Sequence, residues 1–356
     1  MKKYHPIIKK LLEEAIQREA TDLHLCPGWP PILRIDGRLT SLDHKNVLSV
    51  EETRELALSL LSPEQEAKFW TNKDVDLSLS YEDKARFRIN VYQQLGKVSV
   101  ALRLIPSKVR TIEELNLPVN LRQFTQASQG FFLVVGPSGH GKSTALAAMI
   151  EEVNRTRYSH IITIEDPIEY IFKPKHCIID QREVGTDVLN FQEGLRSMFR
   201  EDADVVMLGE MRDPETISAA VTAAETGHLI FSTLHTNTAA QTIDRIIDSF
   251  PPHQQGQIRL QLSATLLGIL SRRLLPCLAG GLINAVELLI VNTAVRNLIR
   301  EAKVHQINMV IETSVEEGMI SLNRSLADLV KRKLVSLDTA EMYSTNIHEL
   351  RAYLKK

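Results

Sequence analysis

One nine-residue stretch limits what this chain can fold into more than any other part of its sequence. Residues 136–144 read GPSGHGKST and fit G-x-x-x-x-G-K-S/T, the pattern of a phosphate-binding loop. The apolar, β-prone run FFLVV at 131–135 precedes the loop, and residues 144–152 are rich in strong helix formers. A glycine-rich turn with a chance Lys-Ser pair would need neither neighbour. The sequence therefore predicts a strand, a phosphate-binding loop (the P-loop) and a helix, in that order.

The P-loop offers backbone and side-chain groups to a bound phosphate. Its glycines let N–H groups turn inward around phosphate oxygens, and the following helix points its positive end at the same anion. We expect Lys142 to neutralise the β- and γ-phosphates of ATP and the Ser143 hydroxyl to hold Mg²⁺. We expect His140 to point outward and to ligate nothing. The predicted ATP-binding residues are Gly136, Pro137, Ser138, Gly139, His140, Gly141, Lys142, Ser143 and Thr144.

Length and composition exclude several classes of protein. A chain of 356 residues suggests two domains, and 44% hydrophobic with 24% charged residues argues against disorder. A formal net charge of −2 is not typical of a nucleic-acid-binding protein, so no nucleic-acid partner is expected. The three cysteines form no C-x-x-C pair, which fits a reducing cytosol and predicts neither a zinc ribbon nor disulfides. No stretch is long and apolar enough to span a bilayer, so any membrane contact is expected to be peripheral.

The first third predicts a small α+β domain over residues 1–105. An amphipathic helix opens it, and short strands, a broken helix and three alternating strands follow. Arg86, Arg88 and Arg103 lie on neighbouring predicted strands, where they form either a solvated cationic face or arginine fingers that reach a phosphate on another subunit. Residues 106–118 are interpreted as a linker, and residues 119–356 as the nucleotide domain.

Carboxylates and histidines follow the predicted strands of the nucleotide domain. Glu165 and Glu169 come after the apolar run 160–164, as either a ligand-binding group or an acidic surface turn. Glu210 is the first acidic residue after the run 204–208, which describes a Walker-B strand whose acid polarises water or supports Mg²⁺. His228 and His235 bracket another strand, on opposite faces, which argues against a joint metal site.

This order of elements predicts a RecA-like P-loop fold, with parallel strands joined by helical crossovers. The tail from about residue 263 is expected to be mainly helical. The tail contains two basic clusters, the pair Arg272 and Arg273 and the run 331–333. Both are expected to lie on solvated helix faces.

Several segments together resemble the secretion-superfamily ATPases of type IV pili and type II secretion. The segments that carry the resemblance are TDLHL at 21–25, the P-loop, TIEDPIEY at 163–170, GEMRD at 209–213, AETGH at 224–228 and HT at 235–236. Residues 294–301, AVRNLIRE, are similar to the A-I-R-N-L-I-R-E segment of the pilus retraction ATPases, the PilT family. Ala203, Val295 and the loop 277–281 depart from the family pattern, and none of them touches a predicted phosphate contact.

The resemblance implies roles that the spacing alone does not give. Glu210 would be the catalytic Walker-B acid, Glu165 and Glu169 the Asp-box acids, His228 and His235 the His-box residues, and Arg88 and Arg103 arginines that act in trans. The family fold implies a PAS-like N-terminal domain and a homohexameric ring with ATP and Mg²⁺ between subunits. The ring would act on an inner-membrane pilus platform protein, and the chain would be cytoplasmic and peripheral at that membrane through this partner alone.

Four functions stay open at this point. A retraction motor that depolymerises the pilus for twitching motility is favoured by residues 294–301. A pilus assembly or type II secretion ATPase would usually carry a four-cysteine zinc module and a longer N-terminal extension, neither of which this sequence contains. An accessory paralogue of a retraction motor stays possible on the same residues. A nucleic-acid-dependent RecA-like motor is disfavoured by the near-neutral charge.

Overall fold

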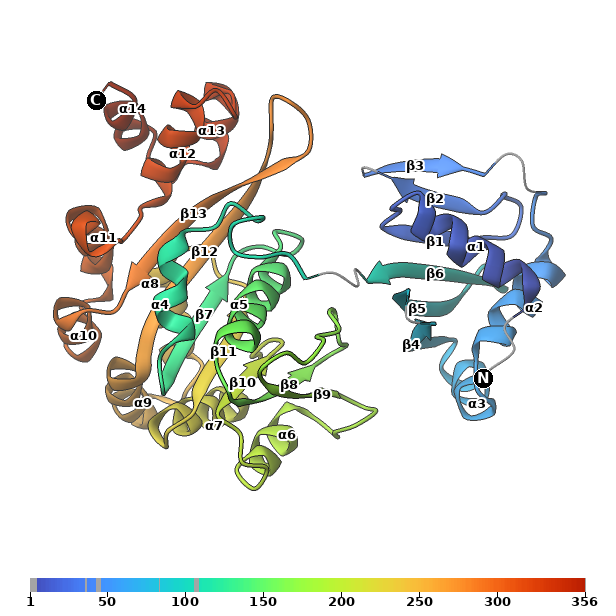
Figure 1. Ribbon diagram of the computed structural model, residues 1–356, viewed down its shortest axis with the longest axis horizontal. Coiled ribbons are helices and arrows are strands. Elements are labelled where there is room, and N and C mark those ends of the chain that lie inside the picture. The colour runs from blue at the N-terminus through green and yellow to red at the C-terminus, as the bar shows by residue number, and fades with distance from the viewer. Residues whose placement is uncertain (1–4, 36, 43–45, 83, 106–108, 356) are drawn as a thin grey trace. The chain divides into compact units, whose positions relative to one another are not determined.

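The chain divides into two units, Met1–Lys108 (unit 1) and Val109–Lys356 (unit 2) (Figure 1). This computed structural model describes residues 5–35, 37–42, 46–82, 84–105 and 109–355. The predicted linker begins at residues 106–108, which lie outside the described part. Residues 109–118 belong to the second unit, where Ile112, Leu115 and Leu117 are buried in its core.

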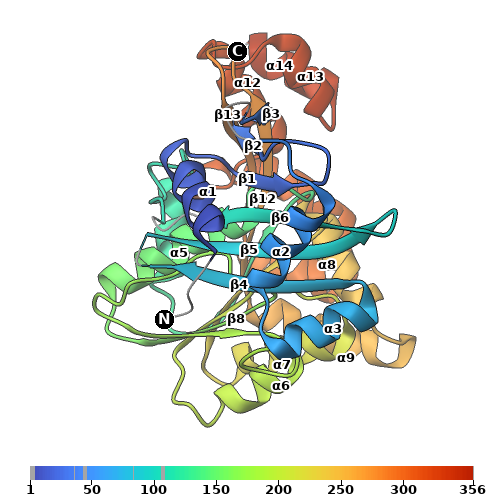
Figure 2. The same cartoon turned by 90° about the vertical axis from the view of Figure 1, so that its right-hand side faces the viewer.

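The first unit is a six-stranded antiparallel sheet with the order β3–β2–β1–β6–β5–β4. Figure 2 shows α1 and α2 lying across one face of this sheet. α2 and α3 each begin with a capping box, at Ser49 and Ser62 respectively. The second box begins a new helix at the break that the sequence predicts near Ser62. The short strand β3 was not predicted. The elements are α1 (Pro6–Gln17), β1 (Asp22–Leu25), β2 (Ile32–Ile35), β3 (Arg38–Ser41), α2 (Val50–Leu60), α3 (Pro63–Asn72), β4 (Asp74–Tyr81), β5 (Ala85–Gln94) and β6 (Lys97–Ile105).

The second unit is built on a seven-stranded sheet with the order β13–β12–β7–β11–β10–β8–β9. Every adjacent pair is parallel except β12 with β13, which form an antiparallel hairpin. The strands are β7 (Gly130–Val135), β8 (His160–Glu165), β9 (Ile178–Glu183), β10 (Val205–Leu208), β11 (Leu229–Leu234), β12 (Leu266–Pro276) and β13 (Leu282–Ile290). Over the described residues of the tail, five α-helices follow the hairpin, in line with the prediction, but the hairpin that precedes them was missed, as was β9.

Helices cover both faces of this sheet, as the βαβ order predicts. Phe131 and Leu133 of β7 pack with residues of α7, whereas Phe132 and Val134 pack with residues of α5 on the other face. The helices are α4 (Arg122–Thr125), α5 (Lys142–Thr156), α6 (Phe191–Met198), α7 (Pro214–Glu225), α8 (Ala239–Asp248), α9 (Pro252–Thr265), α10 (Thr293–Arg300), α11 (Ile307–Thr313), α12 (Leu322–Lys331), α13 (Leu337–Tyr343) and α14 (Ile347–Lys355). No described helix combines the length and apolar character that crossing a bilayer requires.

Candidate functional site

The P-loop lies between β7 and α5, at the edge where the parallel strands β7, β11, β10 and β8 end. Gly136 has φ +146°, and a Cβ there would meet the backbone oxygen of Arg272 at 2.6 Å, so the position requires glycine. Gly141 is the N-cap of α5, with φ +73°. No side chain caps this helix, which leaves its first N–H groups available to a phosphate.

Lys142 begins α5 and folds back over the loop. Its side chain is 8% exposed. The ammonium donates to the backbone oxygens of Gly136 at 3.0 Å and Pro137 at 3.1 Å, and lies 3.3 Å from Nδ1 of His235. Burial lowers the pKa of Lys142, while the charges of Glu210 and Glu169 raise it. These two carboxylates therefore help to keep a buried cation charged at the phosphate position.

A chain of contacts joins Lys142 to the predicted Walker-B acid. Nε2 of His235 lies 3.1 Å from Oε2 of Glu210, whose other oxygen forms an ion pair with Arg212. An ammonium group can only donate, so Nδ1 of His235 accepts and the ring proton sits on Nε2, where it is donated to Glu210. The imidazole thus fixes the orientation of the carboxylate, and the P-loop, His box and Walker-B strand meet in one site.

The ends of β10 and β11 are also tied together. The hydroxyl of Thr233 donates to the backbone oxygen of Gly209 at 2.6 Å, and the amide of Met211 donates to the backbone oxygen of Thr233 at 3.3 Å. These bonds hold the turn that carries Glu210 against the strand that ends before His235. The two side chains are therefore positioned by neighbouring strands of the sheet.

The two predicted Asp-box acids have different surroundings. Glu165 ends β8 and is 4% exposed, whereas Glu169 is exposed. Glu165 accepts from the Thr163 hydroxyl at 2.7 Å and from the Glu169 amide at 3.2 Å. Burial, with a smaller contribution from the charge of Glu169, raises the pKa of Glu165 to about 7, although its hydrogen bonds oppose the rise. Near neutral pH this carboxyl is poised to hold or release a proton.

The Asp-box segment is bonded directly to the P-loop helix. The hydroxyls of Tyr170 and Thr144 lie 2.9 Å apart. Burial raises the pKa of Tyr170, so the phenol stays protonated. A movement of the P-loop helix therefore acts directly on the segment that carries Glu165 and Glu169.

The prediction that His140 points outward is wrong. Its ring lies against β12, where Nδ1 accepts the backbone N–H of Leu274 at 2.9 Å. Burial lowers the pKa of His140, and the nearby charges of Arg273, Lys142 and Arg272 lower it further. His140 is therefore neutral at physiological pH and fastens the tip of the P-loop to the neighbouring strand.

The prediction that Arg272 and Arg273 lie on a solvated helix face is also wrong. Both belong to β12 and are only 2% and 8% exposed. Arg272 donates to the backbone oxygen of Gly141 and to the side chain of Asn284, and Arg273 donates to the backbone oxygen of Asn237 at 2.8 Å. Strand β12 thus holds both the P-loop and the loop that follows the His box, and no sequence motif pointed to it.

The remaining predicted residues are not brought to the P-loop by contacts within unit 2. His228 precedes β11 at the opposite end from His235, with its ring edge-on to Phe199 and its Nδ1 3.0 Å from the Ala223 backbone oxygen. Arg88 and Arg103 belong to unit 1, where they sit directly opposite each other on β5 and β6 and share a face. Arg103 pairs with Asp22 at 2.9 Å.

The site has oxygen ligands suited to a nucleotide-bound Mg²⁺. Within the described ranges, no group of three or more His, Cys, Asp or Glu side chains could hold a metal ion alone. Mg²⁺ in nucleotide sites instead takes one or two protein oxygens and uses phosphates and waters for the rest. The Ser143 hydroxyl and the Glu210 carboxylate fit that need.

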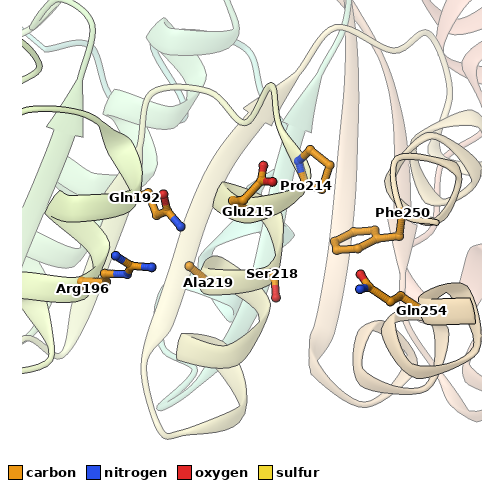
Figure 3. Close-up of a pocket in the computed structure, with 8 residues that line it drawn as sticks. All are labelled: Gln192, Arg196, Pro214, Glu215, Ser218, Ala219, Phe250 and Gln254. Carbon is orange, nitrogen blue, oxygen red and sulfur yellow. The ribbon is translucent and has the colours of Figure 1, made fainter.

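A cavity of about 410 Å³ lies away from these residues (Figure 3). It is formed by α6, the first half of α7, the connection from α8 to α9 and the start of α9. Its lining residues are Gln192, Arg196, Pro214, Glu215, Ser218, Ala219, Phe250 and Gln254, which include none of the predicted site residues.

Comparisons with known proteins agree with this geometry. The family described as "Type II/IV secretion system protein" matches residues 2–280. The chain is 43% identical over 338 residues to the "Type IV pilus retractation ATPase PilT" of Pseudomonas aeruginosa, which covers 94% of this chain and 96% of that protein. It is 36% identical over 348 residues to the "Type IV pilus ATPase PilU" of the same organism, with 98% and 91% covered.

A solved structure matches over the whole length as well. The crystal structure of the pilus retraction motor PilT with bound ADP has a TM-score of 0.91 at 46% identity, and the match covers 97% of this chain and 99% of that one. The predicted fold class, a RecA-like P-loop ATPase domain after a smaller α+β PAS-like domain, is therefore confirmed.

Proposed function

This chain belongs to the type II/IV secretion system protein family, as an ATPase of the PilT type, and from that premise we propose that it drives the retraction of type IV pili. The observation that carries the proposal is the contact chain from Lys142 through His235 to Glu210. These contacts bring a buried lysine and an oriented carboxylate together, which supports a site that binds and hydrolyses ATP. Hydrolysis needs both, the first to stabilise charge on the phosphates and the second to activate water.

The proposed chemistry assigns a role to each group. The P-loop amides and Lys142 bind the β- and γ-phosphates. Ser143 and Glu210 would hold Mg²⁺, which when bound would neutralise charge on the phosphates. Glu210 also orients the attacking water, and His235 keeps that carboxylate in place. Glu165 and Glu169 act from the neighbouring strand.

The proposed assembly is a homohexamer with the nucleotide between subunits. Arg88 and Arg103 then supply positive charge to a neighbouring subunit's phosphates, and His228 acts as the second His-box residue. The proposed partner is an inner-membrane pilus platform protein. The ring is held at that membrane by this partner and not by a membrane segment of the ring itself. A near-neutral net charge supports the absence of a nucleic-acid partner.

The first experiment compares ATP hydrolysis by the wild type, Glu210→Gln and the control Glu215→Gln, with oligomeric mass measured on the same samples. Glu215 is an exposed acid in the first turn of α7, so Glu215→Gln introduces the same chemical change outside the proposed site. We expect a hexameric wild type and control that hydrolyse ATP, and a Glu210→Gln variant that assembles but loses at least a hundredfold in rate. A wild type that binds ATP as a monomer without turnover would contradict the motor.

A second candidate is an accessory role beside a main retraction motor, because the chain is similar over nearly its whole length to two different pilus ATPases of one organism, PilT and PilU. Charge reversal on α10 addresses transmission to the pilus machinery. Arg300 is exposed at the end of α10, and Arg332 is exposed at the end of α12, so Arg332→Glu is a matched control. We expect Arg300→Glu to abolish twitching in cells but spare hydrolysis. Twitching that persists when the whole chain is deleted would instead favour the accessory role.

A further inference from the structure

Arg272 is a buried cation whose partners are all polar groups of unit 2. Its guanidinium donates to the backbone oxygen of Gly141, the last glycine of the P-loop, and twice to Oδ1 of Asn284. It also lies against Gly141 so closely that a Cβ there would approach its Nη1 to 3.1 Å. Because a buried guanidinium without acceptors is costly, these contacts constrain both the arginine and the P-loop carbonyl.

Asn284 extends the contact to another part of the chain. It lies on β13, where it pairs with Leu274, so it is the diagonal neighbour of Arg272 on the same face of the hairpin. Its Oδ1 accepts from Arg272, and its Nδ2 donates to the backbone oxygen of Leu115 at 2.6 Å. The amide side chain of Asn284 therefore joins Arg272, which holds the P-loop, to residues 111–117.

Residues 111–117 form an ordered turn early in unit 2. Their backbone bonds run from Leu115 to Thr111, from Asn116 to Glu113 and from Leu117 to Ile112. The side chains of Ile112, Leu115 and Leu117 are buried. Since unit 2 begins at Val109, this turn lies where the chain passes from one unit to the other.

We propose that Arg272 is a positioning residue for the P-loop, and that Arg272 and Asn284 together couple nucleotide binding to the turn at 111–117. A phosphate that engages the amides of the P-loop fixes the peptide group of Gly141. Its carbonyl then fixes the guanidinium, and the guanidinium fixes the Asn284 amide that holds Leu115. The coupling rests on the proposed binding of nucleotide at the P-loop, but not on hydrolysis or on pilus retraction.

The charge around the P-loop supports the positioning role. Lys142, Arg272 and Arg273 all disfavour protonation of His140. The loop thus lies in the field of three fixed cations, of which only Lys142 belongs to the sequence motif. A positive field of this kind favours a bound polyphosphate.

Two substitutions separate the two halves of the proposal. Arg272→Met keeps the length of the side chain and removes every donor, with the exposed Arg324→Met on α12 as its control. Asn284→Asp keeps the acceptor for Arg272 but removes the donor to Leu115, with the exposed Asn308→Asp on α11 as its control. Arg272→Lys, which retains the charge but not the fork of donors, serves as a rescue and as the alternative if the methionine variant does not fold.

The experiment measures the Kd for ADP by calorimetry, and amide hydrogen exchange of residues 111–117 with and without ADP. We expect ADP to slow exchange of this turn several-fold in the wild type and in both controls. Arg272→Met should weaken ADP binding about tenfold and remove the protection, because hydrogen bonds to a charged group are strong. Arg272→Lys should recover part of the affinity. Asn284→Asp should bind ADP within twofold of the wild type yet lose the protection.

Three results would overturn the proposal. They are a folded Arg272→Met variant with wild-type affinity, a wild type that binds ADP without a response in the turn, and an Asn284→Asp variant that keeps the response. Failure of the proposed function itself gives a different result, because calorimetry would then detect no ADP binding by the wild type or by any variant.

Discussion

The buried carboxyl of Glu165 predicts a specific dependence of stability on pH. Burial raises its pKa from 4.5 to about 7, so the folded state prefers the protonated form. A raised pKa contributes stability that is complete below pH 4.5 and is lost as the pH rises through 7. The whole loss corresponds to about 3 kcal/mol, of which roughly 2.5 kcal/mol falls between pH 5 and pH 8.

The perturbation is Glu165→Gln, which replaces the carboxyl with a neutral group of the same shape. The amide cannot accept both of the hydrogen bonds that Glu165 accepts from Thr163 and Glu169, which adds an offset that does not depend on pH. Only the change in the difference between variant and wild type is therefore diagnostic. We expect the free energy of unfolding of the variant, relative to that of the wild type, to rise by roughly 2.5 kcal/mol between pH 5 and pH 8.

The assay is urea unfolding of the nucleotide-free full chain at several pH values, followed by circular dichroism and by tryptophan fluorescence. Trp29 and Trp70 are the only tryptophans in the sequence, and both belong to unit 1. Fluorescence therefore reports unit 1, which should be unaffected, while circular dichroism also follows unit 2. A difference between the two proteins that stays constant within about 0.5 kcal/mol over this range would refute the reasoning, since it would mean that Glu165 does not titrate there.

Three further predictions follow from the same site and its surroundings. His235→Gln should lower the rate of ATP hydrolysis about a hundredfold with an unchanged Kd for ADP, because in the proposed mechanism the ring orients Glu210 and does not bind phosphate; a loss of ADP binding would contradict this. Tyr170→Phe removes one hydroxyl bond to the P-loop helix and should destabilise unit 2 by about 1 kcal/mol in thermal unfolding, with a stability equal to wild type counting against the bond. Cys177 is buried, and burial raises its pKa. Mass spectrometry should therefore find it alkylated last of the three cysteines, and rapid labelling would show that the segment before β9 opens.

The nucleotide edge of the sheet could be predicted because its signals are local in sequence. The P-loop sits between an apolar strand and a helix, and Glu210 follows directly on the apolar strand β10. In a parallel sheet the carboxyl ends of the strands meet at one edge, so motifs that follow different strands come together. His235 follows the end of β11 and lies near the P-loop, whereas His228, which was also expected at the site, precedes that strand.

The hairpin of β12 and β13 could not be predicted in the same way. Its strands are long and rich in leucine, a composition that favours helix as readily as strand. What decides the structure is pairing of β12 with β7, about 135 residues earlier in the chain. No local pattern carries that information.

The two errors about the P-loop's surroundings have one cause. An arginine pair and a histidine on a glycine loop are usually exposed, so residue type alone assigns Arg272, Arg273 and His140 to the surface. Once β12 pairs beside β7, the same side chains face polar backbone groups of the P-loop and of β12 itself. Arg272 donates to the Gly141 carbonyl, which also accepts the Ala145 amide, and His140 accepts the Leu274 amide. A buried polar group must find a partner, so the P-loop, although it is a sequence motif, depends for its order on a strand that contributes no part of that motif.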